Sequence, residues 1–157
     1  MFLEPDINIE KLNEVALSHQ HRCEIVHEVS QDKKVPRIFL NLLVVGEGGK
    51  MGTKKQNTNK SWDLGPAQIN TIHAEYIEKN YPEKNWVDVA TDPELNISIS
   101  ADIFKDCLRY AKGNIWEAVG CYNSKTINIK TNYLYHIMKT WDYIKDKPKH
   151  SCTAFWD

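Results

Sequence analysis

The most constraining feature of the sequence is an apolar stretch, residues 35–49 (VPRIFLNLLVVGEGG), that closes on one acid and two glycines. Pro36 favours the start of a helix, because a proline at the first helical position loses no hydrogen bond. Three aliphatic residues recur at helical spacing before the acid: Leu40, Leu43 and Val44. Glu47 is therefore expected on their face. The pair Gly48–Gly49 predicts the end of the helix, because glycine readily adopts positive φ.

A carboxyl group at the end of such a helix has unusual surroundings. Aliphatic neighbours, poor solvation and the negative end of the helix dipole all disfavour its ionised form. A carboxyl group that stays protonated near neutral pH suits a general acid. The plain alternative is a capping or surface residue, since glutamate is seldom buried. The stretch alone leaves both interpretations of Glu47 open.

Length and charge bound the possible classes of protein. A chain of 157 residues suggests one domain, residues 1–157, with a core over about residues 10–145. Its 20 basic and 21 acidic residues nearly cancel, which gives no electrostatic reason to expect nucleic acid as a partner. No stretch approaches the roughly 20 apolar residues of a membrane span. The start lacks the features of a signal peptide, so a cytoplasmic protein and one whose signal has been removed both stay open.

Apolar periodicity predicts helices joined by polar connections. We expect helices over residues 8–30, 36–47, 66–80, 97–112, 115–121 and 127–145. The stretch 48–63 reads as an ordered polar loop, and 81–96 as an irregular connection. No strands joined by hairpin turns are evident, so the predicted class is all-α, or mainly α with a minor β element hidden within residues 48–66.

Four cysteines allow one or two disulfides, and none forms a CxxC pair. A bond between Cys23 and Cys107, joining the first helix to the fourth, is a first guess. His19, Cys23 and His27 share a helical face and have the chemistry of zinc ligands, but no fourth ligand is apparent nearby, which favours packed or surface histidines. Cys121 next to a histidine would suit a nucleophile, whereas its apolar segment favours core packing or a disulfide.

Two further stretches offer polar groups to a ligand. In SWDLGPAQIN (residues 61–70), Gly65 would let the backbone approach a ligand, and Gln68 presents both a donor and an acceptor to a hydroxyl or acetamido group. An ordinary helix start with a solvated Gln68 is the alternative. In GCYNS (residues 120–124), Tyr122 stands beside two small polar residues at a helix end. Each signal is weak by itself.

In this order, VGEGG, GPAQIN and GCYNS resemble the soluble lytic transglycosylases, whose catalytic domain is similar to goose-type lysozyme. The likeness is strongest to the small members that accompany type IV secretion, conjugation, pilus and type III secretion machines, and it covers about residues 10–145. It implies a lysozyme-like fold. The sequence departs from the usual pattern at Gly48, where Ser is common, at Ala67, where Met is common, and at Cys121, where Ala is common.

The resemblance implies cleavage of the β-1,4 bond between N-acetylmuramic acid and N-acetylglucosamine in peptidoglycan, without water, to give a 1,6-anhydro sugar. Glu47 would act as acid and then base. Gln68 would bind the sugar beside the cut, Tyr122 would orient Glu47 or the substrate, and Asn123 would hold that corner of the cleft. The remaining implied substrate contacts are Ala67 and Ile69.

Two rival functions remain. Asp63 would position a water for hydrolysis, as in a true lysozyme, although it also suits a turn-capping residue. A module that binds glycan or serves as a scaffold would keep the fold without activity. The resemblance further implies a periplasmic monomer that acts on glycan strands, with secretion or pilus components as possible partners and neither metal nor cofactor.

Overall fold

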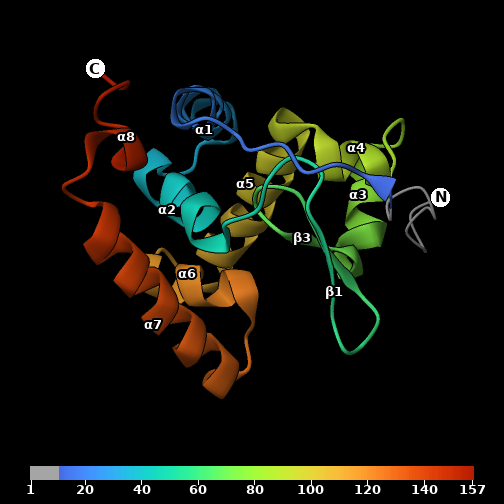
Figure 1. Ribbon diagram of the computed structural model, residues 1–157. Helices are drawn as coiled ribbons and strands as arrows, with labels where there is room; N and C mark the ends of the chain where they lie inside the picture. The colour runs from blue at the N-terminus through green and yellow to red at the C-terminus, as the bar shows by residue number, and fades with distance from the viewer. Residues whose placement is uncertain (1–10) are drawn as a thin grey trace.

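The structure is a computed structural model that describes residues 11–157 and is mainly helical, with a small sheet at one side (Figure 1). The N-terminal half contains α1 (His19–Lys33), α2 (Arg37–Glu47), β1 (Lys54–Gln56), β2 (Trp62–Leu64), β3 (Ile69–Asn70), η2 (Thr71–His73) and α3 (Ala74–Asn80). The C-terminal half contains α4 (Trp86–Thr91), α5 (Pro93–Tyr110), α6 (Ile115–Asn123), α7 (Ile127–Ile144) and α8 (Pro148–Ser151). No helix among residues 11–157 is long and apolar enough to cross a membrane.

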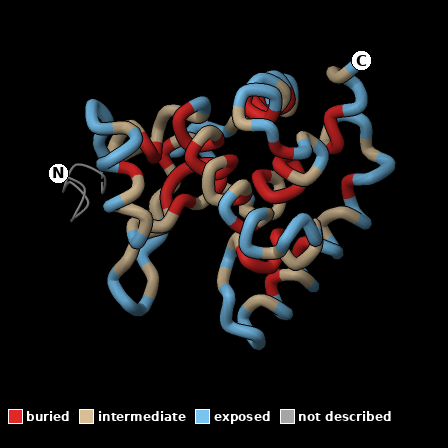
Figure 2. Tube along the Cα trace, turned by 180° about the vertical axis from the view of Figure 1, so that it is seen from behind, coloured by how far each residue is buried: buried red, intermediate tan, exposed pale blue. Residues whose placement is uncertain are grey.

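Helix α2 lies at the centre of the helical part, against α1, α5, α7 and α8. Its middle residues, Leu40 to Val44, are all buried. A helix that is apolar on every side is stable only when other elements surround it. Figure 2 shows the buried segments gathered in the interior, while the turn between β1 and β2 is mostly exposed. The predicted apolar helix ending at Glu47 is confirmed.

The sheet is antiparallel, in the order β1-β2-β3. Two of its strands fall within residues 48–66, where a minor β element was expected. Lys55 pairs with Asp63, and Asp63 pairs with Asn70 on the next strand. Residues directly opposite one another share a face of the sheet. The register therefore brings Asp63 and Asn70 together.

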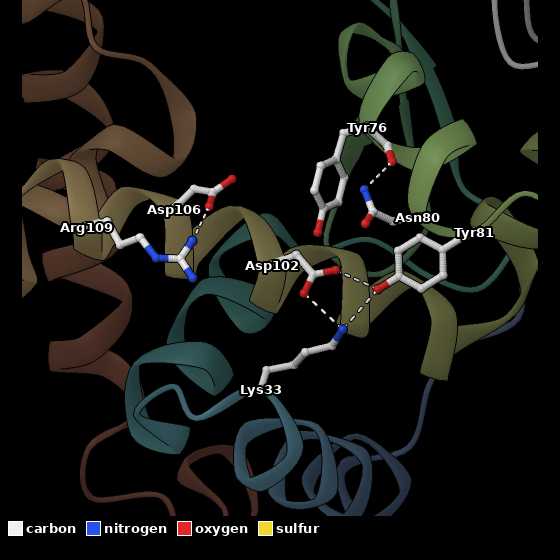
Figure 3. A network of polar contacts seen from close by, with 7 residues as sticks. All are labelled: Lys33, Tyr76, Asn80, Tyr81, Asp102, Asp106 and Arg109. Carbon is white, nitrogen blue, oxygen red and sulfur yellow. Dashed lines mark hydrogen bonds and ion pairs between the residues drawn. The ribbon is translucent and has the colours of Figure 1, made fainter.

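A polar cluster ties the end of α1 to α5 and to the chain after α3 (Figure 3). Lys33 Nζ lies 3.0 Å from Asp102 Oδ1, and the Tyr81 hydroxyl donates to Asp102 Oδ2 at 2.5 Å. Lys33 Nζ also lies 3.2 Å from the Tyr81 hydroxyl oxygen. Burial and the Asp102 charge raise the pKa of Tyr81, so its hydroxyl keeps its proton and remains a donor.

The disulfides differ from the predicted pairing. Cys23 bonds to Cys152 and Cys107 bonds to Cys121, so the guess of Cys23 with Cys107 is wrong. The first bond joins α1 to the residue after α8, and the second joins α5 to α6. No helix was predicted at residues 148–151, and α8 brings Cys152 back to α1.

Three predicted helix boundaries are wrong, each for a local reason. The first helix begins at His19, because Ser18 caps it by accepting from the His21 N–H; residues 8–10 of the predicted helix lie outside the described residues. Residues 66–70 are not helical, since β3 pairs with β2 and Asn70 caps η2. The connection 81–96 holds α4 and the start of α5; α4 begins with a capping box that involves Asn85.

We expect the two disulfides to contribute unequally to stability. Cys23 and Cys152 are 129 residues apart and Cys107 and Cys121 are 14 apart. Chain-entropy reasoning gives about 5 kcal/mol for the long loop and about 3 kcal/mol for the short one. Urea unfolding of C23A/C152A and C107A/C121A measures both. Equal losses, or a larger loss for C107A/C121A, would contradict the expectation.

Candidate active site

Glu47 is the last residue of α2, and two glycines shape the chain after it. Gly48 ends the helix at φ 70°, with its N–H donating to the Val44 carbonyl. Gly49 donates to the Pro66 carbonyl at 3.2 Å. A Cβ on Gly49 would lie 2.0 Å from the Gly65 oxygen, so only glycine fits there. The pair therefore brings the loop of residues 65–68 next to the carboxyl group.

Glu47 opens into a cleft of about 400 Å³. The sheet lies on one side of it, and the end of α6 with the start of α7 on the other (Figure 1). Uncharged polar side chains are the largest group in the lining: Asn57, Asn59, Ser61, Gln68, Asn70, Asn123 and Ser124. Amide and hydroxyl groups donate and accept hydrogen bonds without carrying charge. Such a lining suits a ligand rich in hydroxyl and amide groups.

The surroundings of Glu47 raise the pKa of its carboxyl group to about 7. Burial is the largest cause, and the negative charge of Asp63 adds to it. A hydrogen bond from Tyr133 and the positive charges of His136 and Lys55 act in the opposite direction. Burial has the larger effect, so the net change is an increase in the pKa of Glu47. The carboxyl group is thus half protonated near neutral pH, where a solvated glutamate would be ionised.

Helix α7 contacts the end of α2 through two side chains one turn apart. The Tyr133 hydroxyl donates to Glu47 Oε2 at 2.5 Å, and His136 Nε2 lies 2.7 Å from the Gly46 carbonyl oxygen. Burial and the neighbouring Glu47 charge raise the pKa of Tyr133 well above its usual value, so its hydroxyl stays a donor. No role was predicted for Tyr133, which lies within the helix predicted over residues 127–145. A hydroxyl on an otherwise apolar face was the available signal.

Tyr122 lines the cleft, but its hydroxyl points to other partners. It lies 2.8 Å from Ser100 Oγ and donates to the Ala67 carbonyl at 3.3 Å. Among the described residues, Tyr122 makes no hydrogen bond to Glu47. Its ring stacks near that of Tyr133, with 6.5 Å between the ring centroids. Tyr122 thus joins α6 to α5 and to the loop of residues 65–68, while Tyr133 contacts the acid.

The structure brings three of the four other predicted contact residues to the cleft. Gln68, Ile69 and Asn123 line it. Gln68 adopts φ 52°, and its Nε2 donates to the Gly65 carbonyl at 3.0 Å. Ala67 is fully buried and does not line the cleft, because its backbone groups are bound to residues of the helices behind the loop.

A residue that sequence reasoning missed holds this loop in place. Asn96, buried on α5, donates to the carbonyls of Leu64 and Val89 at 2.9 and 2.8 Å. Its Oδ1 accepts from the Ala67 N–H at 2.8 Å. An amide on the buried face of a helix satisfies its hydrogen bonds inside the protein. The signal was an asparagine among the apolar residues at the start of α5.

Asp63 faces the same cleft as Glu47. Its two carboxylate oxygens accept from Asn70 Nδ2 at 2.8 Å and from Asn57 Nδ2 at 3.1 Å. It lies within β2, and these bonds give it a loop-stabilising role, although no capping of the turn that follows is seen among the described residues. The cross-strand register fixes its position.

The metal and thiol hypotheses find no support. Cys23 and Cys121 are both in disulfides, so neither offers a thiolate. His19 and His27 contact Arg22 and Arg37 through Nδ1 at 2.9 Å each. No group of three or more His, Cys, Asp or Glu side chains that could hold a metal lies within residues 11–157.

Comparison with known proteins places this architecture in a family. The family model for the transglycosylase SLT domain matches residues 31–136, which include Glu47, the sheet and Tyr133. This match covers more than half of the chain, so the chain belongs to the SLT transglycosylase family, and its mainly helical fold with a small sheet is the lysozyme-like fold of that family.

Three relatives show how far the similarity extends. Invasion protein IagB of Salmonella typhi is 31% identical over 102 residues, covering 62% of this chain and 61% of IagB. Protein IpgF of Shigella flexneri is 27% identical over 70% of this chain and 71% of IpgF. A peptidoglycan-binding-like protein of Escherichia coli O157:H7 is 36% identical over 48% of this chain and 44% of its own length. The matched region spans about three fifths of the length of IagB.

Replacing Glu47 by Gln should stabilise the protein at high pH only. The carboxyl group binds its proton more tightly in the folded chain, with a pKa of about 7 against an ordinary 4.5. Stability is therefore complete below about pH 4.5 and falls as the pH rises through 7. A fully buried group with this shift would lose about 3 kcal/mol. For the partly exposed Glu47 we expect E47Q to gain about 2 kcal/mol at pH 8.

Urea unfolding of wild type and E47Q at pH 4.5 and pH 8 measures this gain. E28Q, at an exposed position of α1, is the matched control and should change stability at neither pH. A gain for E47Q of equal size at both pH values would show that the surroundings of Glu47 do not disfavour its charge.

Removing the Tyr133 hydroxyl should raise the pKa of Glu47 further. This hydrogen bond favours the ionised carboxyl group, so Y133F shifts the ionisation of Glu47 above pH 7. Carbon-13 NMR of the glutamate carboxyl groups measures the shift. Y122F serves as the control, because the Tyr122 hydroxyl binds Ser100 and Ala67 instead; a larger shift in Y122F than in Y133F would contradict the assignment.

Proposed function

We propose that the protein is a peptidoglycan lytic transglycosylase that cleaves the β-1,4 bond between N-acetylmuramic acid and N-acetylglucosamine. The observation that carries the proposal is the carboxyl group of Glu47, with a pKa raised to about 7, at the floor of a cleft lined by amides and hydroxyls. Membership of the SLT family supports the same substrate class.

In the proposed reaction Glu47 acts twice. The protonated carboxyl group gives its proton to the glycosidic oxygen as the bond to the anomeric carbon breaks. The resulting carboxylate then accepts the proton of the muramoyl 6-hydroxyl, whose oxygen bonds to the anomeric carbon. The products are a 1,6-anhydro end and a free 4-hydroxyl, and no water is consumed. A pKa near the working pH suits a group that serves as acid and then as base.

Neighbouring residues would hold the reactants. The Tyr133 hydroxyl, 2.5 Å from Glu47 Oε2, fixes the orientation of the carboxyl group. Gln68 and Asn123, which both line the cleft, would bind sugar hydroxyl or acetamido groups. The acetamido group of the muramoyl residue would assist at the anomeric carbon, so that no second enzyme carboxylate is needed, as in other substrate-assisted glycosidases.

A hydrolytic muramidase is the second candidate, because Asp63 lines the same cleft. In that mechanism Asp63 would position a water that attacks the anomeric carbon. Both oxygens of Asp63 accept hydrogen bonds from asparagines of the sheet, an arrangement that suits a structural carboxylate. This observation favours the transglycosylase.

Digestion of purified peptidoglycan with mass analysis of the products tests the proposal. We expect 1,6-anhydro muropeptides from wild type, and a loss of turnover of about 100-fold or more in E47Q, because the amide cannot give up a proton. D63N should retain anhydro products. Reducing ends from wild type together with an inactive D63N would establish the muramidase instead. Binding to sacculi without any release of muropeptides by wild type would establish a binding module.

We also propose that the enzyme opens the cell wall locally where an envelope-spanning secretion or pilus machine is built. The likeness to a protein named for invasion supports this setting. Peptidoglycan lies outside the cytoplasmic membrane, so the proposed substrate requires an extracytoplasmic, periplasmic location. Two disulfides are consistent with an oxidising compartment.

A further inference from the structure

A second hollow, which we call the side groove, opens from the flank of the active-site cleft. It measures about 300 Å³ and lies between α3 and η2 on one side and α5 with the end of α6 on the other. Five residues line both hollows: Ile72, His73, Ile103, Tyr122 and Asn123. A ligand in the cleft can therefore extend into the side groove along a shared wall.

The side groove differs in chemistry from the cleft. Ile103 and the disulfide between Cys107 and Cys121 line it, together with Tyr76 of α3. Figure 3 shows Tyr76 beside α5, with Asp106 further along that helix. Amides and hydroxyls, the largest group in the cleft lining, are here largely replaced by apolar surface. Such surface suits short aliphatic groups better than it suits a chain of sugar hydroxyls.

The charges of the side groove lie at its exposed rim. Lys125 lines it and holds its ammonium group 4.4 Å from the centre of the Tyr110 ring. Asp106 also lines it and is paired with Arg109 at 2.7 Å. Arg109 lies outside the lining but offsets the charge of Asp106, so Lys125 is left as the charge with no carboxylate partner among residues 11–157. The rim favours a ligand with more carboxylates than amines.

We propose that the side groove binds the peptide stem that peptidoglycan carries on the lactyl group of its muramoyl residues. This inference rests on the proposed function. The stem branches sideways from the glycan, is built of alanine and dicarboxylic amino acids, and carries more carboxylates than amines. The apolar lining receives the alanine methyl groups, and Lys125 attracts a carboxylate.

Turnover of stem-bearing glycan strands, compared with strands stripped of stems by an amidase, tests this assignment. Wild type should need about fivefold less of the stem-bearing strands to reach half-maximal rate. K125E should abolish this preference, because it places a negative charge where a carboxylate binds. K139E is the matched control: Lys139 is exposed and lies 4.6 Å from the Tyr135 ring on α7, outside the side groove. It should keep the preference.

Equal use of both strands by wild type, or the same change in K125E and K139E, would overturn the assignment. A binding measurement separates it from the proposed function. Titration of nitrogen-15-labelled protein with the stem tripeptide alanyl-γ-glutamyl-diaminopimelate should shift the amides of residues 103–107 and 121–125 in wild type but not in K125E. Shifts without turnover of any peptidoglycan would disprove the catalytic proposal alone, and turnover without shifts or preference would disprove the stem site alone.

Discussion

The free energy that holds α2 in place also sets the chemistry at its end. Leu40, Leu43 and Val44 are almost wholly buried, and surrounding helices cover the middle of α2. The packing of these turns fixes the position of the last turn of α2. Glu47 therefore lies in a poorly solvated position in either protonation state. Ionising an acid there costs stability above neutral pH, and the aliphatic packing of the same helix offsets that cost. The packing that fixes the position of Glu47 therefore also destabilises its ionised form.

Around that fixed end, the site is assembled from segments distant in sequence. Tyr133 reaches Glu47 from 86 residues further along the chain, and Asn123 reaches the cleft from the end of α6. The sheet supplies the facing wall. Each wall rests on a different support: α7 packs against α2 and α6, and the loop of residues 65–68 is bound to α5 through Asn96. The width of the cleft therefore depends on helix packing more than on the short strands.

Local sequence patterns predicted the parts of this fold that depend on local physics. The apolar helix, its glycine stop and the position of the acid follow from helical spacing and from the conformational freedom of glycine. The beginning of α3 could not be predicted in this way, because pairing between β2 and β3 overrides the helix signal of Pro66. The pairing of Cys23 with Cys152 was also out of reach, since it depends on how the last turn of the chain folds back. The roles of Tyr133 and Asn96 were missed for a similar reason, because both depend on hydrogen-bond partners that lie on other elements.

Asn96 has a consequence for how such a cleft can vary. One buried side chain ties the backbone on both sides of the β2–β3 turn to α5 and to α4, while the tip of the β1–β2 hairpin is exposed at residues 58–60. The turn is thus anchored from behind, independently of the hairpin in front of it. Residues can be inserted at or removed from the hairpin tip, lengthening or shortening the outer lip of the cleft, while Gln68 keeps its place beside the acid. The length of the cleft and the geometry beside Glu47 are therefore separately adjustable.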